Sequence, residues 1–132
     1  MSNDFEKERT DLAAAFRWAA RLNMHEAVAN HFSLAVSDDG SKFLLNPIGM
    51  HFSQICASDL ILVDSNDEST MSKANAPDPT AWAIHGAIHR NNPQARCILH
   101  VHPKYATILA CLEDKTMKPI DQNTMRFYEK VS

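Results

Sequence analysis

Apolar positions recur along this chain with two periods, one typical of helices and one typical of strands. Between Asp4 and Leu22 they return every three or four residues among charged ones, which predicts an amphipathic helix. Two short β-prone runs follow at 31–36 and 42–45, and the polar segment around Gly40 between them predicts a hairpin turn. We therefore expect this helix to cover one side of a sheet that begins with the hairpin.

The second half of the chain alternates between strand and helix patterns. A strand with apolar residues on both faces is predicted over 59–64, and a helix over 79–91 with Asp78 as its N-cap. Residues 96–102 read as a strand, and 103–112 as a further helix. A hairpin followed by helix, strand and helix indicates an α/β domain.

Several apolar side chains in this half are expected to be buried. The inward side of the last helix would consist of Tyr105, Ile108, Leu109 and Leu112. Three cysteines lie in or beside apolar segments and are expected to pack as small hydrophobes: Cys56, Cys97 and Cys111. Because they are odd in number and lack C-x-x-C spacing, they fit the reducing cytoplasm best.

Charge and length exclude several classes of partner. The 132 residues carry a formal net charge of -3 with scattered Lys and Arg, so no basic stripe is available for nucleic acid. No apolar stretch approaches the roughly 20 residues of a membrane span, and the amino terminus is too polar for a signal peptide. A small-molecule partner is expected.

The strongest chemical signal is the pair His100 and His102 near the end of a predicted strand. Residues i and i+2 of a strand share one face, so both imidazoles can reach a common point, as metal ligands must. The alternative is two hydrogen-bonded histidines at a strand end, and the spacing alone does not separate these interpretations.

Other histidines are weaker candidates. His85 and His89 lie one turn apart on the predicted helix, but no H-E-x-x-H order is present. A structural role is favoured for His89, whereas ligation and a structural role are evenly balanced for His85. Asn30 could cap the hairpin or bind a ligand. The remaining histidines, each more typical of a surface or backbone-bonding residue, are His25, His31 and His51.

From about Leu12 to Phe127 the order of these segments resembles the class II aldolase and adducin family. The motifs that carry the resemblance are Asn30-His31-Phe32-Ser33, Asn46-Pro47-x-Gly49, and His85 followed by His100-x-His102. The resemblance implies a three-layer α/β/α fold with a central, mainly antiparallel sheet, in a chain that forms cyclic homotetramers. It also implies one family domain over residues 1–132, which we expect to be cut short at its C-terminal end.

The resemblance also implies site residues. His100 and His102 would bind a divalent metal, with Zn²⁺ favoured and Fe²⁺ or Mn²⁺ as alternatives. The family's third histidine would lie beyond Ser132, which leaves His85, water or a neighbouring subunit as substitutes. Asn30, Gly49 and Thr80 would bind substrate, often through a phosphate.

One departure weakens the expected chemistry. The family's catalytic glutamate, four residues before the helix histidine, is replaced by Ala81, and Pro79 and Thr80 stand in place of two serines. A methyl group cannot transfer a proton, and such transfer commonly contributes about 10²–10⁴ in rate.

Three functions follow from these observations. The first is a metal-dependent lyase that cleaves a carbon–carbon bond of a small hydroxy-carbonyl compound through a metal-stabilised enediolate. The second is a non-catalytic, adducin-like binding domain. The third is iron-dependent oxidative carbon–carbon cleavage on the same fold.

Overall fold

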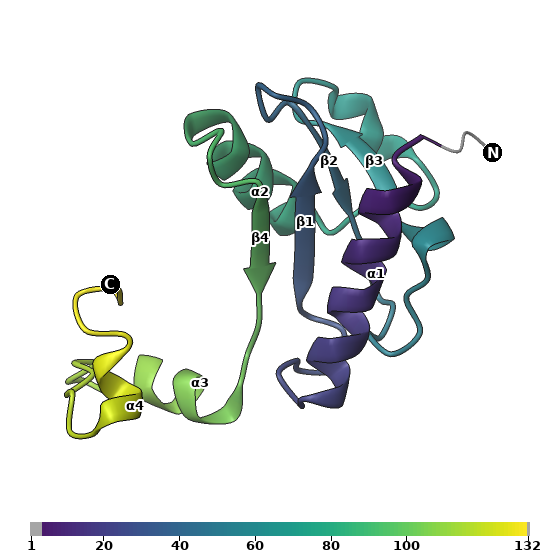
Figure 1. The fold of residues 1–132 in the computed structure, drawn as a ribbon. Coiled ribbons are helices and arrows are strands. Elements are labelled where there is room, and N and C mark those ends of the chain that lie inside the picture. Colours follow the sequence, from purple (N-terminus) through teal and green to yellow (C-terminus); the bar gives the residue numbers. More distant parts are fainter. Residues whose placement is uncertain (1–3, 132) are drawn as a thin grey trace. The chain divides into compact units, whose positions relative to one another are not determined.

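The computed structural model describes residues 4–131, which form two compact units, 4–102 and 103–131. The first unit contains a sheet with helices on both faces (Figure 1), and the second contains two short helices. The α-helices and strands of the first unit are α1 (Glu6–Arg21), β1 (His31–Ala35), β2 (Lys42–Leu45), β3 (Ile61–Asp64), α2 (Pro79–Asn91) and β4 (Cys97–His100), and two short 3-10 helices flank β3, η1 (Ala57–Asp59) and η2 (Glu68–Ser72). Those of the second unit are α3 (Lys104–Ala110) and α4 (Gln122–Met125).

The sheet has four strands in the order β3-β2-β1-β4, and every pairing among them is antiparallel. The predicted hairpin is confirmed, since β1 and β2 pair with Ser33 opposite Leu45. Gly40 in its turn has φ +72, and a Cβ there would lie 2.3 Å from the carbonyl oxygen of His89. Only glycine allows this close approach between the turn and α2.

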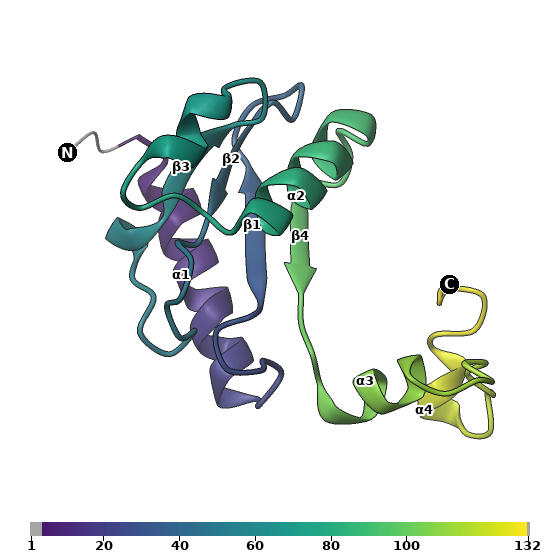
Figure 2. The same cartoon turned by 180° about the vertical axis from the view of Figure 1, so that it is seen from behind.

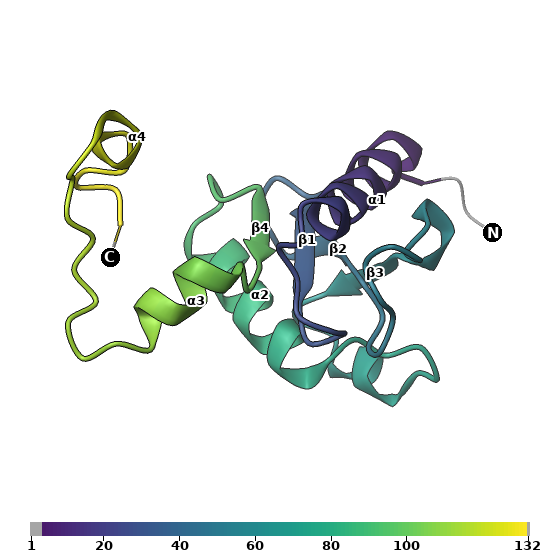
Figure 3. The same ribbon diagram turned by 90° about the horizontal axis from the view of Figure 1, so that it is seen from below.

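The helices cover opposite faces of the sheet, with α1 on one side and α2 on the other (Figures 2 and 3). Phe32 of β1 packs in a cluster with Phe16 of α1, whereas Ala35 packs with Ala81 of α2. Phe32 and Ala35 are separated by an odd number of positions, so alternation along the strand places them on opposite faces. The predicted three-layer α/β/α fold is confirmed.

The start of α2 is as predicted. The carboxylate of Asp78 accepts hydrogen bonds from the backbone N–H groups of Thr80 at 2.8 Å and Ala81 at 3.0 Å, while Pro79 occupies the first turn. These bonds satisfy donors that a helix start otherwise leaves free. They also fix the first turn of α2, in which Ala81 packs against the sheet.

The strand expected over 96–102 is shorter in the structure and ends at His100. The N–H of His102 donates instead to the carbonyl oxygen of Met24, at 3.0 Å. The chain therefore leaves the sheet between the two histidines. No helix within residues 4–131 is long and apolar enough to cross a membrane.

Two expectations about burial are wrong. Tyr105, Ile108 and Leu112 are 80%, 49% and 50% exposed, because α3 lies in a unit in which no described residue is buried. The cysteines are free and exposed. Cys97 lies on β4, an edge strand, and the other two lie outside the sheet.

Candidate metal and substrate site

The rings of His100 and His102 meet at the end of β4. Their Nε2 atoms are 3.0 Å apart, although His102 lies beyond the last strand residue. Two nitrogens bound to one tetrahedral zinc ion at about 2.0–2.1 Å lie roughly 3.3–3.4 Å apart. The observed spacing is close to that value, so the two Nε2 atoms can serve one ion with a small adjustment.

Each of these rings is held through its other nitrogen. Nδ1 of His102 lies 2.7 Å from Oε2 of Glu26, and Nδ1 of His100 lies 3.1 Å from Nε2 of His31. Metal-binding histidines are typically oriented in this way, by a carboxylate or another acceptor on the distal nitrogen. The arrangement leaves Nε2 as the ligand atom of both rings.

The pair forms only part of a coordination shell. Within residues 4–131, no group of three or more His, Cys, Asp or Glu side chains is placed to hold a metal ion. A catalytic site usually takes about three protein ligands. The two rings can therefore supply two of the protein ligands of a metal site, and the other ligands would have to come from elsewhere.

Behind His100 a row of hydrogen-bonded groups runs into the interior, between β1 and α2. Nδ1 of His31 is 2.6 Å from Nε2 of His85, whose Nδ1 contacts Oγ of Ser33. The same Oγ is 2.8 Å from Nε2 of His89, and Nδ1 of His89 is 2.8 Å from the carbonyl oxygen of Ala95. The row begins at the carbonyl of Ala95 and ends at the ring of His100. We call its members the histidine array: the carbonyl of Ala95, His89, Ser33, His85, His31 and His100.

Local structure explains why the array forms. His31 and Ser33 are alternate residues of β1 and so share one face, and His85 and His89 are one turn apart on α2. Their contacts join the β1 face to α2. His31 also lies directly opposite His100 in the sheet register, which brings those two rings together.

Burial keeps the inner histidines neutral. It lowers the pKa of His85 to about 3, with smaller effects from His31 and His89. Burial, together with a smaller effect of His100, lowers the pKa of His31 to about 4, although the charge of Asp78 acts in the opposite direction. Burial also lowers the pKa of His89 and of His100. A neutral imidazole has one donor and one acceptor nitrogen, so proton placement in the array is restricted.

A small cavity of about 30 Å³ lies beside His31. Asn30 lines it and is 2% exposed; its Oδ1 accepts from the N–H of Glu26, but its Nδ2 has no partner. Asp78 and Ala81 line the same cavity. A buried amide N–H₂ without a partner is costly, which makes Asn30 a ready donor for a ligand atom.

The other two predicted substrate residues lie next to this cavity in sequence but not in its lining. Gly49 has φ +77, and open space surrounds the position that a Cβ would take. It follows Ile48, which lines the cavity. Thr80 is exposed in the first turn of α2, immediately before Ala81. Asn30 and Ala81 thus line the same cavity, whereas Gly49 and Thr80 are only the sequence neighbours of residues that line it.

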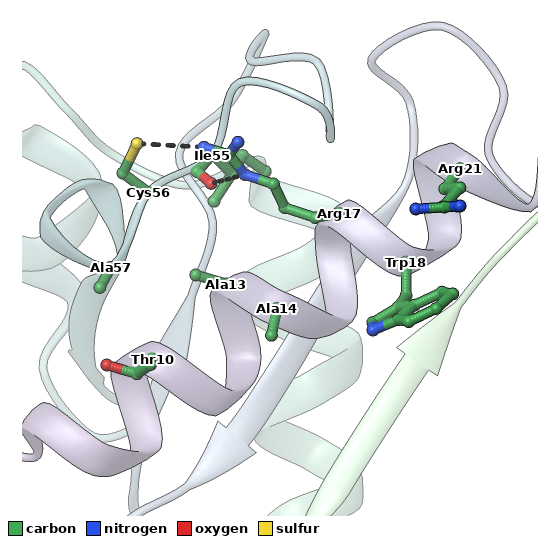
Figure 4. A pocket seen from close by; sticks show the side chains of 9 residues that line it. All are labelled: Thr10, Ala13, Ala14, Arg17, Trp18, Arg21, Ile55, Cys56 and Ala57. Atoms are coloured by element: carbon green, nitrogen blue, oxygen red, sulfur yellow. Dashed lines mark hydrogen bonds between the residues drawn. The ribbon is translucent and has the colours of Figure 1, made fainter.

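A larger open hollow of about 620 Å³ runs along α1 (Figure 4). None of the histidines lines it. Its Arg17 is already engaged, with Nε donating to the carbonyl oxygen of Ile55 at 3.2 Å and Nη2 donating to Sγ of Cys56 at 3.3 Å. The hollow therefore lacks the convergent chemistry of the histidine region.

Sequence reasoning missed three contributors, Glu26, His31 and Ser33. The alternation of His31 and Ser33 on one face of β1, taken with the i, i+4 spacing of His85 and His89, is the signal that could have paired them. Glu26 gave no comparable signal, because it lies in a loop and meets His102 only through the fold.

Comparison with known proteins assigns the chain to a family. The model of the Class II Aldolase and Adducin N-terminal domain matches residues 10–132. A Pseudomonas aeruginosa protein named as a class 2 aldolase, PA3430, is 30% identical over 117 residues, which are 89% of this chain and 44% of that protein. The 4-hydroxy-3-prenylphenylpyruvate oxygenase/4-hydroxy-3-prenylbenzoate synthase of Streptomyces roseochromogenus is 29% identical, over 89% of this chain and 42% of its own.

A solved structure is also similar. The aldolase II superfamily protein from Pseudomonas syringae superposes with a TM-score of 0.82 at 29% identity, over 97% of this chain and 51% of that one. The chain thus spans less than half the length of the two curated relatives and about half of the solved structure. The resemblance seen in the sequence motifs is confirmed, and the chain belongs to the class II aldolase and adducin N-terminal domain family.

Proposed function

We propose that this chain supplies two ligands, His100 and His102, to the divalent-metal site of an enzyme that cleaves carbon–carbon bonds of small hydroxy-carbonyl compounds. The observation that carries the proposal is the convergence of the two Nε2 atoms, 3.0 Å apart, while both Nδ1 atoms have other partners. The two Nε2 atoms lie within hydrogen-bonding distance of each other, and the same convergence is what two ligands of one ion require.

The donor set suits Zn²⁺, with Fe²⁺ and Mn²⁺ as alternatives, since imidazole binds all three. When bound, such an ion polarises a substrate carbonyl. The remaining ligands would come from outside residues 4–131, from a neighbouring subunit or from water. His85 supports the site indirectly, because both its ring nitrogens already contact His31 and Ser33.

The chain's own residues would bind substrate and move protons beside this pair. Asn30 would donate from Nδ2 to a substrate oxygen, and Gly49 and Thr80 would border the same place. Ala81 cannot act as an acid or base. Asp78 is the carboxylate that lines the cavity, and one of its oxygens accepts both helix N–H bonds. Its second oxygen is the group we assign to proton transfer.

A second candidate reaction is oxidative carbon–carbon cleavage of a keto acid with iron and oxygen. Two observations favour it: the similarity to a Streptomyces protein named as an oxygenase, and Ala81 in the glutamate position. Oxidative cleavage has less need of the missing acid–base group. Oxygen uptake with keto acids would select this reaction over a redox-silent lyase.

We also propose a homo-oligomeric assembly, a tetramer by likeness to the family, in the reducing cytoplasm. The three exposed free cysteines support the compartment, because exposed thiols persist where disulfides do not form.

The test is a cleavage assay on a panel of hydroxy-carbonyl and keto acid substrates, with Zn²⁺ or Fe²⁺ added and with chelator. We expect activity that depends on metal, is lost in His102→Ala and is kept in His51→Ala, a control histidine bonded to His25 and Ser53. Absence of turnover with any metal would contradict the enzymatic proposal and favour an adducin-like binding domain.

A further inference from the structure

We propose that the histidine array, from the carbonyl of Ala95 to the ring of His100, positions the metal ligand by fixing which of its nitrogens carries the proton. The inference rests on the proposed function of His100 as a ligand. His31, Ser33, His85 and His89 would be positioning residues that never touch the metal.

The inner end of the array has a fixed direction. A backbone carbonyl only accepts hydrogen bonds, so Nδ1 of His89 must donate to Ala95. His89 is 0% exposed, and no carboxylate among the described residues bonds to its ring. The ring is therefore neutral, and its Nε2 accepts the hydroxyl hydrogen of Ser33, 2.8 Å away.

That choice propagates outward. Ser33 has a single hydroxyl hydrogen and has used it, so its Oγ must accept from Nδ1 of His85. Neutral His85 then accepts at Nε2, which requires Nδ1 of His31 to donate across their 2.6 Å contact. Each group leaves its neighbour a single choice.

The last step reaches the metal ligand. His31, protonated on Nδ1, accepts at Nε2 from Nδ1 of His100. The lone pair of His100 must then lie on Nε2, the atom that faces His102. With Glu26 accepting from Nδ1 of a neutral His102, the Nε2 lone pairs of both rings point at one place, where a proton or a bound metal ion would remove their repulsion.

The closed inner end separates this role from proton conduction. A proton-conducting row needs an outlet to solvent or to an exchangeable acid. This array ends on an amide carbonyl, and both His85 and His89 are 0% exposed. It can set an orientation but has no exit for a proton.

The test combines ¹⁵N NMR of the histidine rings in the metal-free chain with zinc titration. In the wild-type chain we expect His31, His85, His89 and His100 all to carry their proton on Nδ1. A ring of His31 or His85 protonated on Nε2 would overturn the inference without any variant.

The variant Ser33→Ala removes the hydroxyl that sets the direction. We expect a mixture of ring forms at His85, His31 and His100, and zinc affinity lower by about 10–100-fold, the usual effect of losing a ligand's supporting bond. Ser33→Thr keeps the hydroxyl and should restore Nδ1 protonation. The matched control is Val63→Ala, which removes buried volume at a 0% exposed position outside the array.

Unchanged ring forms in folded Ser33→Ala, or an affinity equal to that of Val63→Ala, would overturn the inference. The proposed function fails differently. If the wild-type chain binds no metal, the ligand assignment is wrong, while the ring forms still report whether the array sets proton positions.

Discussion

The two units of the chain differ in what holds their helices. In unit 4–102 the rings of Phe16 and Phe32 stack at 4.7 Å, both are at most 1% exposed, and helices cover both faces of the sheet. In unit 103–131 no described residue is buried. Its exposed apolar side chains include Tyr105, Ile108, Leu112, Ile120, Met125, Phe127, Tyr128 and Val131.

The difference shows that helix signals and core signals are separable. Asp121 caps α4 by accepting from the N–H of Thr124 at 2.7 Å, so local bonds define this helix without burial. The paired histidines and the array need rigid packing on several sides, and all of them lie in unit 4–102. Stability and site geometry should therefore respond to changes in that unit above all.

The largest expected effect is in the core behind β1. Phe32→Ala removes a ring that is 1% exposed and contacts both Phe16 and Phe52. We expect the free energy of unfolding to fall by about 3–5 kcal/mol, from lost burial and the cavity left behind. Urea denaturation measures it. A loss below about 1 kcal/mol would mean that the core lies elsewhere.

Next in size is Gly40→Ala. The new Cβ would lie 2.3 Å from the carbonyl oxygen of His89, and the φ of +72 is itself unfavourable for alanine by about 1–2 kcal/mol. Gly49→Ala is the matched control, because its φ is +77 but open space surrounds it. We expect Gly40→Ala to cost more in denaturation experiments. Equal losses of unfolding free energy in the two variants would show that the backbone of His89 can move away from the new Cβ at little cost.

The third prediction concerns pH. Below about pH 6.5 the unfolded chain protonates His85, whereas burial lowers the pKa in the folded chain to about 3. The unfolded state then binds more protons than the folded state. The contribution of His85 to the free energy of unfolding is therefore fully present above pH 6.5 and falls as the pH drops toward 3. This one ring contributes a slope of up to about 1.4 kcal/mol per pH unit.

His85→Gln should show a correspondingly shallower slope. Unfolding free energies measured between pH 7 and pH 4.5, with chelator present, compare the two proteins. Parallel curves would mean that His85 is not kept neutral by burial.

The smallest effect is expected in the second unit. Ile108 is 49% exposed, so Ile108→Ala should change the free energy of unfolding by no more than about 0.5 kcal/mol. Comparison with Phe32→Ala in the same denaturation experiment sharpens the contrast between the units. A loss of 2 kcal/mol or more would show that α3 is buried in the protein in solution.

Local patterns in the sequence predicted most of the fold. The hairpin, the Asp78 cap and the three layers followed from periodicity, turn residues and the family resemblance. The prediction that one side of α3 is buried was wrong, because a helical period shows which side is apolar but not whether another element covers that side. Similarly, the i, i+2 spacing predicted that His100 and His102 approach each other on one strand, but the strand ends at His100 and the N–H of His102 bonds to Met24. The contact of His102 with Glu26 likewise depends on a loop placed by the whole fold.

The most direct test of the central claim is zinc bound by the purified chain, measured by titration and by metal mass spectrometry in wild type, His100→Ala, His102→Ala and His51→Ala. We predict that the wild type and His51→Ala bind zinc equally and that removing either paired ring abolishes most of the binding. Equal binding in all four proteins, or none in any of them, would contradict the assignment of His100 and His102 as metal ligands.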